Sequence, residues 1–544
     1  MAPRQVGRGL RSLGSTWRAL IAGLLVTIVA RPAGAQDSIG AVIRGLVVGE
    51  VEMSRLYASR GWAPLWLDGP DMTRPGRAAL GELLAAASHG LDPTDYNGWA
   101  LDSVAGRLGR ARASTLDLAR LDLLLSLSMC RYLEDLHTGR ARFFPFARRA
   151  AGSVDWGAAL EQGVAGDSIP RLVEASEPRL TQYRNLRLLL ARYRALAADS
   201  TVPVVPSGPV VPPGHPYADA EVLRRRLRLE GDLLDDDSLA TALRRFQLRH
   251  GLRADSRLGP LTLAELNTPL AHRVHQIELA LERLRWLPPL SAHPFVVVNI
   301  PAFQLFAFDS AGGAGTPSLT MKVVVGKAMD TKTPMLFERM RYVEFRPYWN
   351  VPRSILLAEM LPQLRRHPEY LRRHDMEVVT REGRTLGDSV SPRILRRLAK
   401  GDLGVRQSPG PSNALGLVKF AFPNAAGVYM HGTPETELFS QARRDFSHGC
   451  IRVEDPAALA AWALRFQAGW PPERIAAAME GTATVRVPLA RTLNVAVFYT
   501  TVVATPEGAP QFYPDIYGRD AALTELLRRA RPVPPKIAAA PPPR

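Results

Sequence analysis

Only one of the two cysteines in this 544-residue sequence has neighbours suited to chemistry. Cys450 follows Gly449 and comes two positions after His448, and another histidine, His431, ends the strand-like run VYM. The thiolate is the reactive form of cysteine, and a free thiol has a pKa of about 8.5, so a nearby imidazole or cation is needed to activate it. A lone cysteine with histidines elsewhere in the chain indicates a nucleophile for acyl transfer. A buried thiol and a redox thiol are the alternatives.

The backbone beside Cys450 could also take part in catalysis, whereas the second cysteine lies in a different setting. Glycine lets the main chain approach a substrate carbonyl closely, so the N–H groups of Gly449 and Cys450 could stabilise an oxyanion. Cys130 lies in the apolar helical run LDLLLSLSMCRYLEDL and is predicted to be a buried structural thiol. Two cysteines exclude a disulfide framework and any multi-cysteine metal site, and the histidines lack carboxylate-supported metal spacing, so no metal site is predicted.

The composition is typical of a multidomain globular protein. A length of 544 residues suggests roughly three or four domains. A hydrophobic content of 46% against 22% charged residues excludes wholesale disorder. The formal charge of +17 is spread along the chain without an aromatic-interleaved basic stripe, so no nucleic-acid partner is predicted. An anionic cell envelope suits this charge better, and an Arg-rich surface of no specific role is the alternative.

The first 35 residues have the pattern of a secretory signal peptide. A basic start precedes the apolar run Ala19–Ala30, and a small-x-small cleavage pattern ends at Ala35. Export is therefore predicted. A retained inner-membrane anchor is the alternative, although twelve apolar residues are fewer than the roughly 20 that a bilayer span needs.

The elements that must position these residues begin with a helical region. From residue 39 to residue 200, apolar residues recur at three- and four-residue spacing, as in Leu116–Leu136 and Leu180–Ala198. This region is predicted to be a helical scaffold domain. Residues 201–217 follow with six prolines and predict a stiff, extended linker.

Residues 218–270 are predicted to be a compact helical module, because helical periodicity breaks at Gly251 and Gly259-Pro260 opens another helix. The module resembles the small three-helix peptidoglycan-binding domain. The matching residues are Phe246-Gln247, Gly251-Leu252, Asp255, Gly259-Pro260, Thr262 and Leu266-Asn267. Ser256 stands where that family usually has glycine. The resemblance implies glycan binding, and a pure spacer with the same fold is the alternative.

Strand patterns dominate residues 290–525, which predict a mainly-β domain. The expected strands are Phe295–Ile300, Gln304–Phe308, Leu319–Val325, Val418–Phe422, Gly427–Met430, Thr484–Val487 and Val495–Val503. The Leu/Arg-rich residues 353–407 predict a helical insertion, and such insertions often cover active sites. Ala457–Phe466 predicts one more helix, and the Pro-rich residues 531–544 predict a disordered tail.

The residues around His431 and Cys450 form a longer pattern that resembles the L,D-transpeptidase (YkuD-type) catalytic domain. Fifteen residues separate His431 from the run SHGCIR that begins at Ser447, which is the order and spacing of that family's signature. Further segments resemble the large multidomain members of Gram-negative periplasms. They are Arg346–Pro352, Gly410-Pro411, Asn413–Gly416, Lys419-Phe420, Phe422–Asn424, Trp62–Asp68, Gly90–Tyr96 and Leu136–Arg140. The resemblance implies a multidomain α+β protein of the periplasm, with a helical scaffold and a lid over the catalytic domain.

The resemblance also implies a role for each site residue. Cys450 would be the nucleophile and His431 its base, with the Gly432 carbonyl orienting the imidazole. His448 would line the site; it is the alternative base, although on an extended segment it would stand beside Cys450, roughly 6.6 Å along the chain. The N–H groups of Gly449 and Cys450 would form the oxyanion hole. The expected substrate contacts are Arg452, whose forked donors suit a carboxylate, together with Tyr429, Trp349 and Asn350.

The activity implied by the resemblance is acyl transfer between peptidoglycan stem peptides, without cofactor or ATP. Cys450 would attack the third residue of a tetrapeptide, release D-Ala, and pass the acyl group to an amine of another stem as a 3→3 cross-link. A protein amine is the alternative acceptor, and carbapenems would acylate the same thiol. The partners would be stem peptides, glycan and other cell-wall enzymes. The competing functions are an L,D-carboxypeptidase or cysteine endopeptidase, and a non-enzymatic wall anchor.

Overall fold

The computed structural model describes residues 38–47, 50–108, 113–141, 154–288, 294–309 and 316–530. The predicted signal at residues 1–35 and the predicted tail at residues 531–544 lie outside the described residues. The described residues form two compact units, one taken from residues 38–179, 277–288 and 521–530, the other from residues 180–276 and 294–520. Each unit combines segments that are far apart in sequence, so the units divide the chain differently from the predicted domains.

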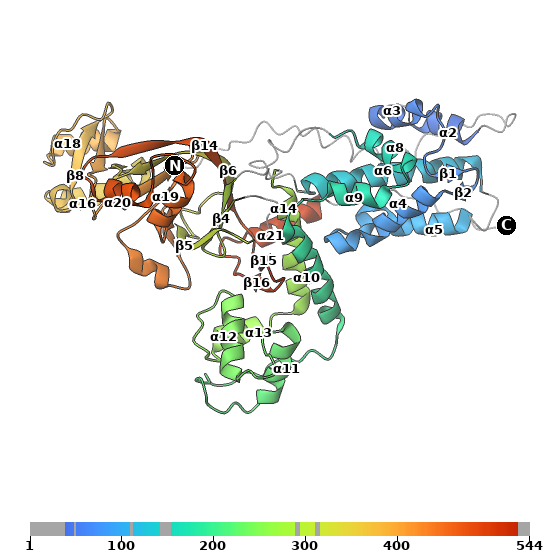
Figure 1. The fold of residues 1–544 in the computed structure, drawn as a ribbon, viewed down its shortest axis with the longest axis horizontal. Helices are drawn as coiled ribbons and strands as arrows, with labels where there is room; N and C mark the ends of the chain where they lie inside the picture. The colour runs from blue at the N-terminus through green and yellow to red at the C-terminus, as the bar shows by residue number, and fades with distance from the viewer. Residues whose placement is uncertain are drawn as a thin grey trace. The chain divides into compact units, whose positions relative to one another are not determined.

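The first unit is a set of helices around one long helix (Figure 1). That helix is α6 (Thr115–Thr138), which begins where the Ser114 hydroxyl accepts a hydrogen bond from the Asp117 N–H. Its partners are α2 (Ile39–Leu46), α4 (Arg74–Leu84), α5 (Gly98–Leu108), α8 (Trp156–Ala165) and α9 (Ile169–Ser176), with α3 (Val51–Ser59) packed on α8. The helix predicted over Leu116–Leu136 is confirmed, since α6 covers this range. Its leucines, at three- and four-residue spacing, are buried on several sides of the helix.

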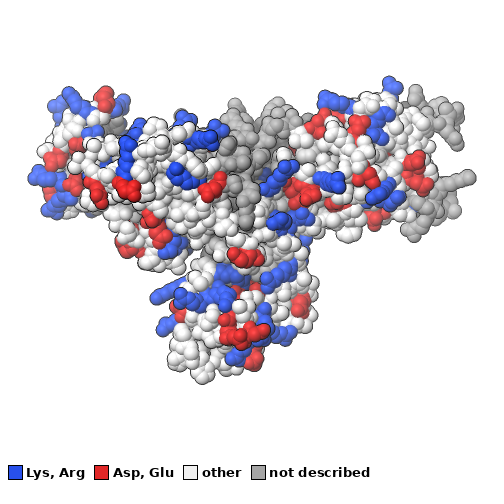
Figure 2. Space-filling view, in the orientation of Figure 1, with Lys and Arg blue, Asp and Glu red and all other residues white. Residues whose placement is uncertain are grey.

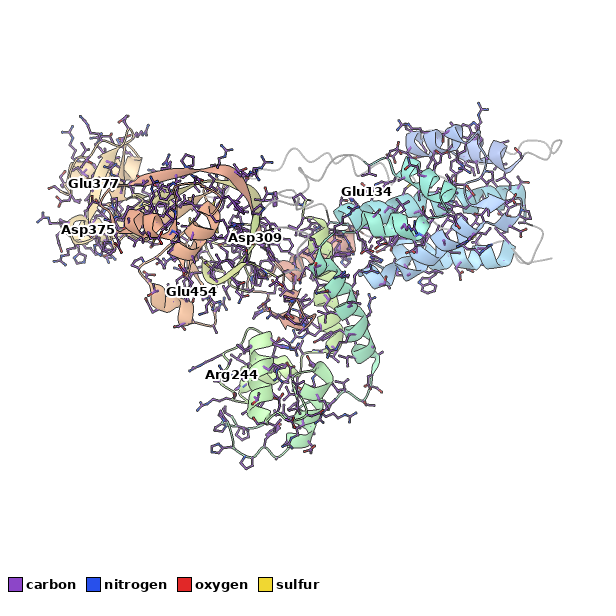
Figure 3. All side chains as sticks on the ribbon, viewed as in Figure 1. Glu134, Arg244, Asp309, Asp375, Glu377 and Glu454 are labelled. Atoms are coloured by element: carbon purple, nitrogen blue, oxygen red, sulfur yellow. The ribbon has the colours of Figure 1, made fainter. Side chains whose placement is uncertain are left out.

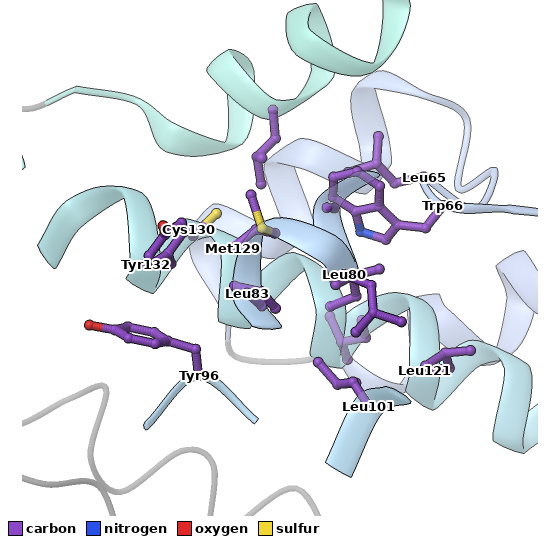
Figure 4. Packing of buried hydrophobic residues seen from close by; sticks show 14 of the residues in the cluster. Leu65, Trp66, Leu80, Leu83, Tyr96, Leu101, Leu121, Met129, Cys130 and Tyr132 are labelled. Atoms are coloured by element: carbon purple, nitrogen blue, oxygen red, sulfur yellow. The ribbon is translucent and has the colours of Figure 1, made fainter. Parts of the chain in front are cut away.

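Cys130 lies in the hydrophobic core of this unit, on α6 (Figure 4). Its residue is 3% exposed, and Met129, Tyr132 and Leu83 belong to the same buried cluster. The predicted burial of this thiol is confirmed.

The second unit begins with α10 (Thr181–Ala198), which confirms the last predicted scaffold helix. Three short helices follow: α11 (Ala220–Glu230), α12 (Leu239–Arg249) and α13 (Pro260–Leu266). They share a small core that includes Leu227, Phe246 and Leu266. The helix α14 (Leu270–Arg285) comes next, and its residues from 277 onward belong to the first unit.

A buried glutamine fixes the loop between α12 and α13. Gln247 donates through Nε2 to the Arg257 carbonyl at 3.0 Å and to Thr262 Oγ1 at 3.1 Å. Its Oε1 accepts from the Ser256 N–H at 2.8 Å. Ser256 has a φ of +59°, in the left-handed region that favours glycine. The chain therefore keeps a glycine-type turn with serine in it, held by the Gln247 side chain.

A nine-stranded sheet forms the centre of the second unit, in the order β12-β5-β13-β11-β10-β6-β14-β3-β4. The strands are β3 (Phe295–Asn299), β4 (Gln304–Phe308), β5 (Leu319–Gly326), β6 (Leu336–Phe345), β10 (Val418–Ala421), β11 (Met430–His431), β12 (Asp445–Ser447), β13 (Ile451–Val453) and β14 (Val485–Phe498). A further pairing of β4 with β5 closes eight of these strands into a ring, with β12 outside on β5. Closure gives most strands two hydrogen-bonded neighbours, which holds their register firmly.

Two of the strand predictions need correction. The segment predicted as Gly427–Met430 is a strand only at Met430–His431, because the Asn424 side chain builds a turn by accepting from the Val428 N–H and donating to the Val428 carbonyl. The segment predicted at Thr484–Val487 and the start of the one predicted at Val495–Val503 form a single strand, β14, whose register shifts between Pro488 and Leu493. The predicted second strand is interrupted after Phe498, and its last residues, Val502-Val503, belong to β15 (Val502–Ala504). The predicted strands at Phe295, Gln304 and Leu319 and the helix α19 (Pro456–Leu464) are confirmed.

The insertion at residues 353–407 is not purely helical as predicted. It contains a π-turn at Leu356–Met360, the helices α16 (Leu361–Arg366), α17 (Tyr370–Arg373) and α18 (Pro392–Lys400), and the strands β8 (Met376–Thr380) and β9 (Leu403–Gln407). These strands pair with β7 (Trp349–Asn350) in the order β7-β9-β8. The β-branched pair Val378-Val379 stabilises an extended segment that the surrounding Leu/Arg composition hides.

The insertion carries its own core and its own charge pairs. Leu364, Leu371, Val378 and Leu398 belong to a separate buried cluster. Figure 3 labels Glu377 on β8, whose carboxylate pairs with Arg406 on β9. An independent core allows such a subdomain to move as one body.

The surface charge agrees with the distribution expected from the sequence. Figure 2 shows Lys and Arg interspersed with Asp and Glu over the visible face, with no continuous stripe of one sign. Within the part of the chain that the structure describes, no helix is both long enough and apolar enough to span a bilayer.

The second unit ends in a small hairpin, β15 (Val502–Ala504) and β16 (Pro510–Phe512). The helix α21 (Arg519–Arg529) follows. Tyr517, between the hairpin and α21, donates its hydroxyl to the Gly326 carbonyl at 2.5 Å at the end of β5. This segment therefore braces the end of the strand beside Cys450.

Candidate active site

Cys450 lies on a crossover between two strands that flank β5. β12 pairs parallel with one edge of β5, and β13 pairs antiparallel with the other, so residues 448–450 pass over the end of β5 at Gly326. Gly449 turns the chain there with a φ of +111°, a conformation that L side chains rarely adopt. A Cβ on Gly326 would meet the Thr331 carbonyl at 1.9 Å. The two glycines therefore permit the close backbone approach that places the thiol.

Hydrogen bonds hold the crossover in place. Thr333 Oγ1 donates to the Gly449 carbonyl and Thr331 Oγ1 to the Ser447 carbonyl, each at 2.9 Å. The Ser447 hydroxyl donates to the Cys450 carbonyl at 2.5 Å and accepts from the Gly449 N–H at 3.2 Å. In this structure the Gly449 N–H, a predicted oxyanion donor, is thus directed at Ser447.

His431 lies on β11, beside β13 in the sheet. Its Nδ1–H donates to the Gly432 carbonyl at 2.6 Å, which leaves a lone pair on Nε2. The residue is 5% exposed. Burial lowers the pKa of His431 to about 3, and the nearby cations Arg452 and Lys419 add to this effect. The imidazole is therefore neutral at physiological pH and has the tautomer that a general base requires.

The Cys450 sulfur is partly buried and faces several stabilising groups. Burial raises the pKa of the thiol, while the Tyr429 N–H, the Tyr429 hydroxyl and the cations Lys419 and Arg452 lower it. The net pKa of the thiol is raised, so the resting site holds a neutral thiol and a neutral imidazole. Attack on a carbonyl then requires proton transfer to a base in the same step.

His448 faces in a different direction. It is an exposed residue, and its Nε2 lies 2.6 Å from Glu359 Oε1 on the π-turn of the insertion. The structure therefore links His448 to the insertion and His431 to the strand beside Cys450.

The predicted substrate contacts fall into two groups. Tyr429 is next to the sulfur, with its ring centroid 5.6 Å from that of His431, and Arg452 is the cross-strand neighbour of His431. The Arg452 guanidinium pairs with Glu435. Trp349 and Asn350 are on β7, where they pair with Gln407 and Arg406. Trp349 packs against the core of the insertion, so these two residues belong to the insertion sheet, and their contact with substrate stays a prediction.

Sequence reasoning missed Lys419 and Glu359 as parts of this site. Lys419 Nζ lies 4.2 Å from the ring centroid of Tyr429. One signal was present: the chain has only six lysines among its 69 basic residues, and this one occurs in an apolar strand. No signal of this kind marked Glu359. Among the described residues, no group of three or more His, Cys, Asp or Glu side chains could hold a metal ion.

Comparison with known proteins identifies two regions of the chain. Residues 51–190 match the family of scaffold domains, and residues 293–487, which contain His431 and Cys450, match the family of L,D-transpeptidase catalytic domains.

A protein of Haemophilus influenzae named "Putative L,D-transpeptidase" is 30% identical over 248 residues, which cover 44% of this chain. The match covers 47% of that relative, so the chain spans about half the length of the protein it matches. The chain is thus a multidomain α+β protein with a helical N-terminal region and a β-rich region that matches an L,D-transpeptidase catalytic domain.

Proposed function

We propose that this protein is an L,D-transpeptidase that forms 3→3 peptidoglycan cross-links through a thioester on Cys450. The observation that carries the proposal is the position of Cys450 at the end of β5, where Tyr429 donors face its sulfur and a neutral His431 occupies the neighbouring strand. A reactive thiol needs both groups, because the donors stabilise the thiolate and the imidazole accepts its proton.

The first half-reaction breaks the bond to the terminal D-Ala of a tetrapeptide stem. The Cys450 sulfur forms a bond to the carbonyl carbon of the third residue, and its proton moves to His431 Nε2. Collapse of the tetrahedral intermediate expels the D-Ala amine, which takes the proton from His431. A thioester and free D-Ala remain.

In the second half-reaction the side-chain amine of another stem attacks the thioester. His431 Nε2 accepts a proton from the amine and returns it to the Cys450 sulfur as the thioester bond breaks. The new amide is the 3→3 cross-link, and the thiol is restored. The acyl transfer is thus divided into two easier steps without a cofactor.

The oxyanion would be stabilised by the backbone of the crossover. The Cys450 N–H would donate a hydrogen bond to the oxyanion. The Gly449 N–H would become a second donor once it exchanges its 3.2 Å bond to Ser447 Oγ for the substrate oxygen. Glycine at position 449 is needed in either case because of its φ of +111°.

The insertion would act as a lid over the thioester. Its π-turn contacts the crossover through Glu359 and His448, and its separate core lets it move as a unit. By excluding water it would favour the amine as acceptor. A chain that lacks residues 353–407 should release more tripeptide per cross-link than the intact chain. An unchanged ratio of tripeptide to cross-link would contradict the role of the insertion as a lid.

The deciding experiment is incubation of the full chain with purified muropeptides, followed by mass analysis of the products. The expected products are 3→3 dimers and D-Ala, both absent with Cys450→Ala and retained with Cys130→Ala. Tripeptide as the sole product would instead assign an L,D-carboxypeptidase. Wall binding without turnover by the unaltered chain would assign an anchor, and a carbapenem adduct missing from Cys450 would argue against the thiol site.

Location and glycan binding are separate proposals. Periplasmic export depends on residues 1–35, and fusion of this segment to a reporter active only after export tests it. Glycan binding depends on residues 218–270, and co-sedimentation of the full chain and of a chain without this module with purified sacculi compares the two.

A further inference from the structure

A row of charged and polar side chains crosses five strands beside the thiol. In register, Arg452 on β13 pairs with His431 on β11, His431 with Lys419 on β10, Lys419 with Glu344 on β6, and Glu344 with Arg486 on β14. Directly paired residues on neighbouring strands lie side by side on the same face of a sheet. The row therefore places Lys419 next to the catalytic strand through backbone register and not through a mobile loop.

Glu344 anchors the middle of this row. It is 6% exposed and accepts from Arg486 Nε at 2.9 Å, with the Arg486 Nη2 at 2.8 Å. Its carboxylate also favours the protonated form of Lys419, against the burial that lowers the pKa of this lysine. The ammonium of Lys419 is thus retained in a partly buried position.

Lys419 reaches the thiol through the Tyr429 ring. Its Nζ lies 4.2 Å from the ring centroid, within the range of a cation–π contact. The hydroxyl and the N–H of Tyr429 both face the Cys450 sulfur. A cation on the ring restricts the phenol, and it also adds positive potential near the sulfur.

We propose that Lys419 is a positioning residue for Cys450: its ammonium holds the Tyr429 phenol against the sulfur and favours the thiolate that attacks the substrate carbonyl. The chemistry of this inference rests on the proposed function, but the effect is measured at the thiol itself. Tyr429 would thereby serve the nucleophile, a role beyond the substrate contact predicted for it.

The other charges around the sulfur are largely compensated. Arg452 pairs with Glu435, and His431 is neutral. His448 is engaged by Glu359 on the insertion. Lys419 is therefore the cation whose removal should change the field at the sulfur most, because Glu344 already has Arg486 as a second partner.

The test is the rate of Cys450 alkylation by iodoacetamide as a function of pH, measured on the full chain. Peptide mass mapping separates Cys450 from Cys130, the other thiol of the chain. Lys419 is one of the cations that lower the pKa of the Cys450 thiol, and a nearby opposite charge shifts a pKa by roughly one unit or more. In Lys419→Met we expect the midpoint to rise by about one pH unit, which lowers the thiolate fraction at neutral pH about tenfold.

Two variants control for charge and for general effects of substitution. Lys419→Arg keeps the cation and should retain a midpoint close to that of the unaltered chain. Lys322→Met removes a lysine that is outside the charged row and whose Nζ pairs with Glu454 at 3.0 Å. This variant should leave the alkylation midpoint unchanged. A midpoint for Lys419→Met equal to that of the unaltered chain would overturn the proposal, provided that both proteins show the same thermal transition.

Tyr429→Phe supplies a second measurement if Lys419→Met does not fold. The loss of the hydroxyl should raise the midpoint with the lysine still present, and an unchanged midpoint would overturn the proposal. Where both variants fold, the double variant should shift less than the sum of the two single shifts, because Lys419 acts through Tyr429. Fully additive shifts would refute this coupling.

The alkylation profile also separates this inference from the proposed function. A raised midpoint in Lys419→Met, together with no 3→3 dimers from the unaltered chain, would retain the positioning role and reject the transpeptidase. Dimers from the unaltered chain, with no shift in the variant, would do the reverse.

Discussion

Cys130 is buried and Cys450 is partly buried, yet only Cys450 is surrounded by groups that favour its ionised form. Around Cys130 on α6, burial raises the pKa of the thiol, and Glu52, Asp155 and Glu134 raise it further. Around Cys450, burial is again the largest effect on the pKa, but Tyr429 and two cations oppose it. Burial therefore favours the protonated form of both thiols. Only the hydrogen-bond donors and cations around Cys450 make that thiol a nucleophile.

The difference follows from the architecture around each residue. A helix interior offers its neighbours no free backbone donors, since its N–H groups bond within the helix. At the end of β5 the chain turns over a strand edge, so that Tyr429, just before β11, and cations on β10 and β13 act on one sulfur. A strand crossover can thus build a reactive site where a helix core cannot.

The largest expected difference between the thiols is in turnover. Cys450→Ala should abolish release of D-Ala from tetrapeptide stems, because the other thiol, Cys130, is buried in a helical core, whereas Cys130→Ala should keep the turnover of the unaltered chain. Product release followed by mass spectrometry checks both variants. Residual dimer formation in Cys450→Ala would contradict the assignment of the nucleophile.

The next largest effect separates the two histidines. His431→Gln should lower kcat about 100-fold or more, since a positioned general base contributes about 10²–10⁴. His448→Gln removes a contact with Glu359 and should cost less than about tenfold. Steady-state rates with a tetrapeptide substrate give both values. Equal losses would mean that His448 shares the proton transfer.

The surroundings of the two thiols should also differ in how much stability a serine substitution costs. Cys130→Ser places a hydroxyl in an apolar core and should lower the free energy of unfolding by about 1–3 kcal/mol. Cys450→Ser, at a partly exposed site with hydrogen-bond donors, should cost less than about 1 kcal/mol. Urea unfolding of both variants gives the comparison, and a larger loss for Cys450→Ser would reverse the proposed division.

The smallest effect is the pH dependence that His431 adds to stability. Its pKa in the folded chain is about 3, below the ordinary 6.5, so the unfolded chain takes up the proton first as the pH falls. This contribution is complete above pH 6.5 and is lost progressively toward pH 3. Between pH 7.5 and 5 the unaltered chain should lose about 1–2 kcal/mol more stability than His431→Gln. Urea unfolding at the two pH values checks this difference.

Local periodicity predicted most helices and strands because their patterns lie within a few turns of chain. Leu116–Leu136 was predicted within two residues of each end of α6, and the strand at Gln304–Phe308 was predicted at its observed bounds. The errors occurred where side chains compete with the pattern, as at Asn424, or where composition misleads, as at Val378-Val379 in the insertion. The closure of β4 on β5 was not predicted, since it depends on pairing and not on local pattern.

The sequence by itself singled out Cys450 from the two thiols and paired it with His431 by spacing. Residue type and residue spacing can both be read directly from the sequence. Only the tertiary structure decided that His448 faces Glu359, that the Gly449 N–H bonds Ser447, and that Lys419 lies over the Tyr429 ring. These contacts join residues through strand register and turn geometry, which depend on hydrogen bonds between distant segments. Residue spacing can therefore name a nucleophile, while the groups that tune it are set by the fold.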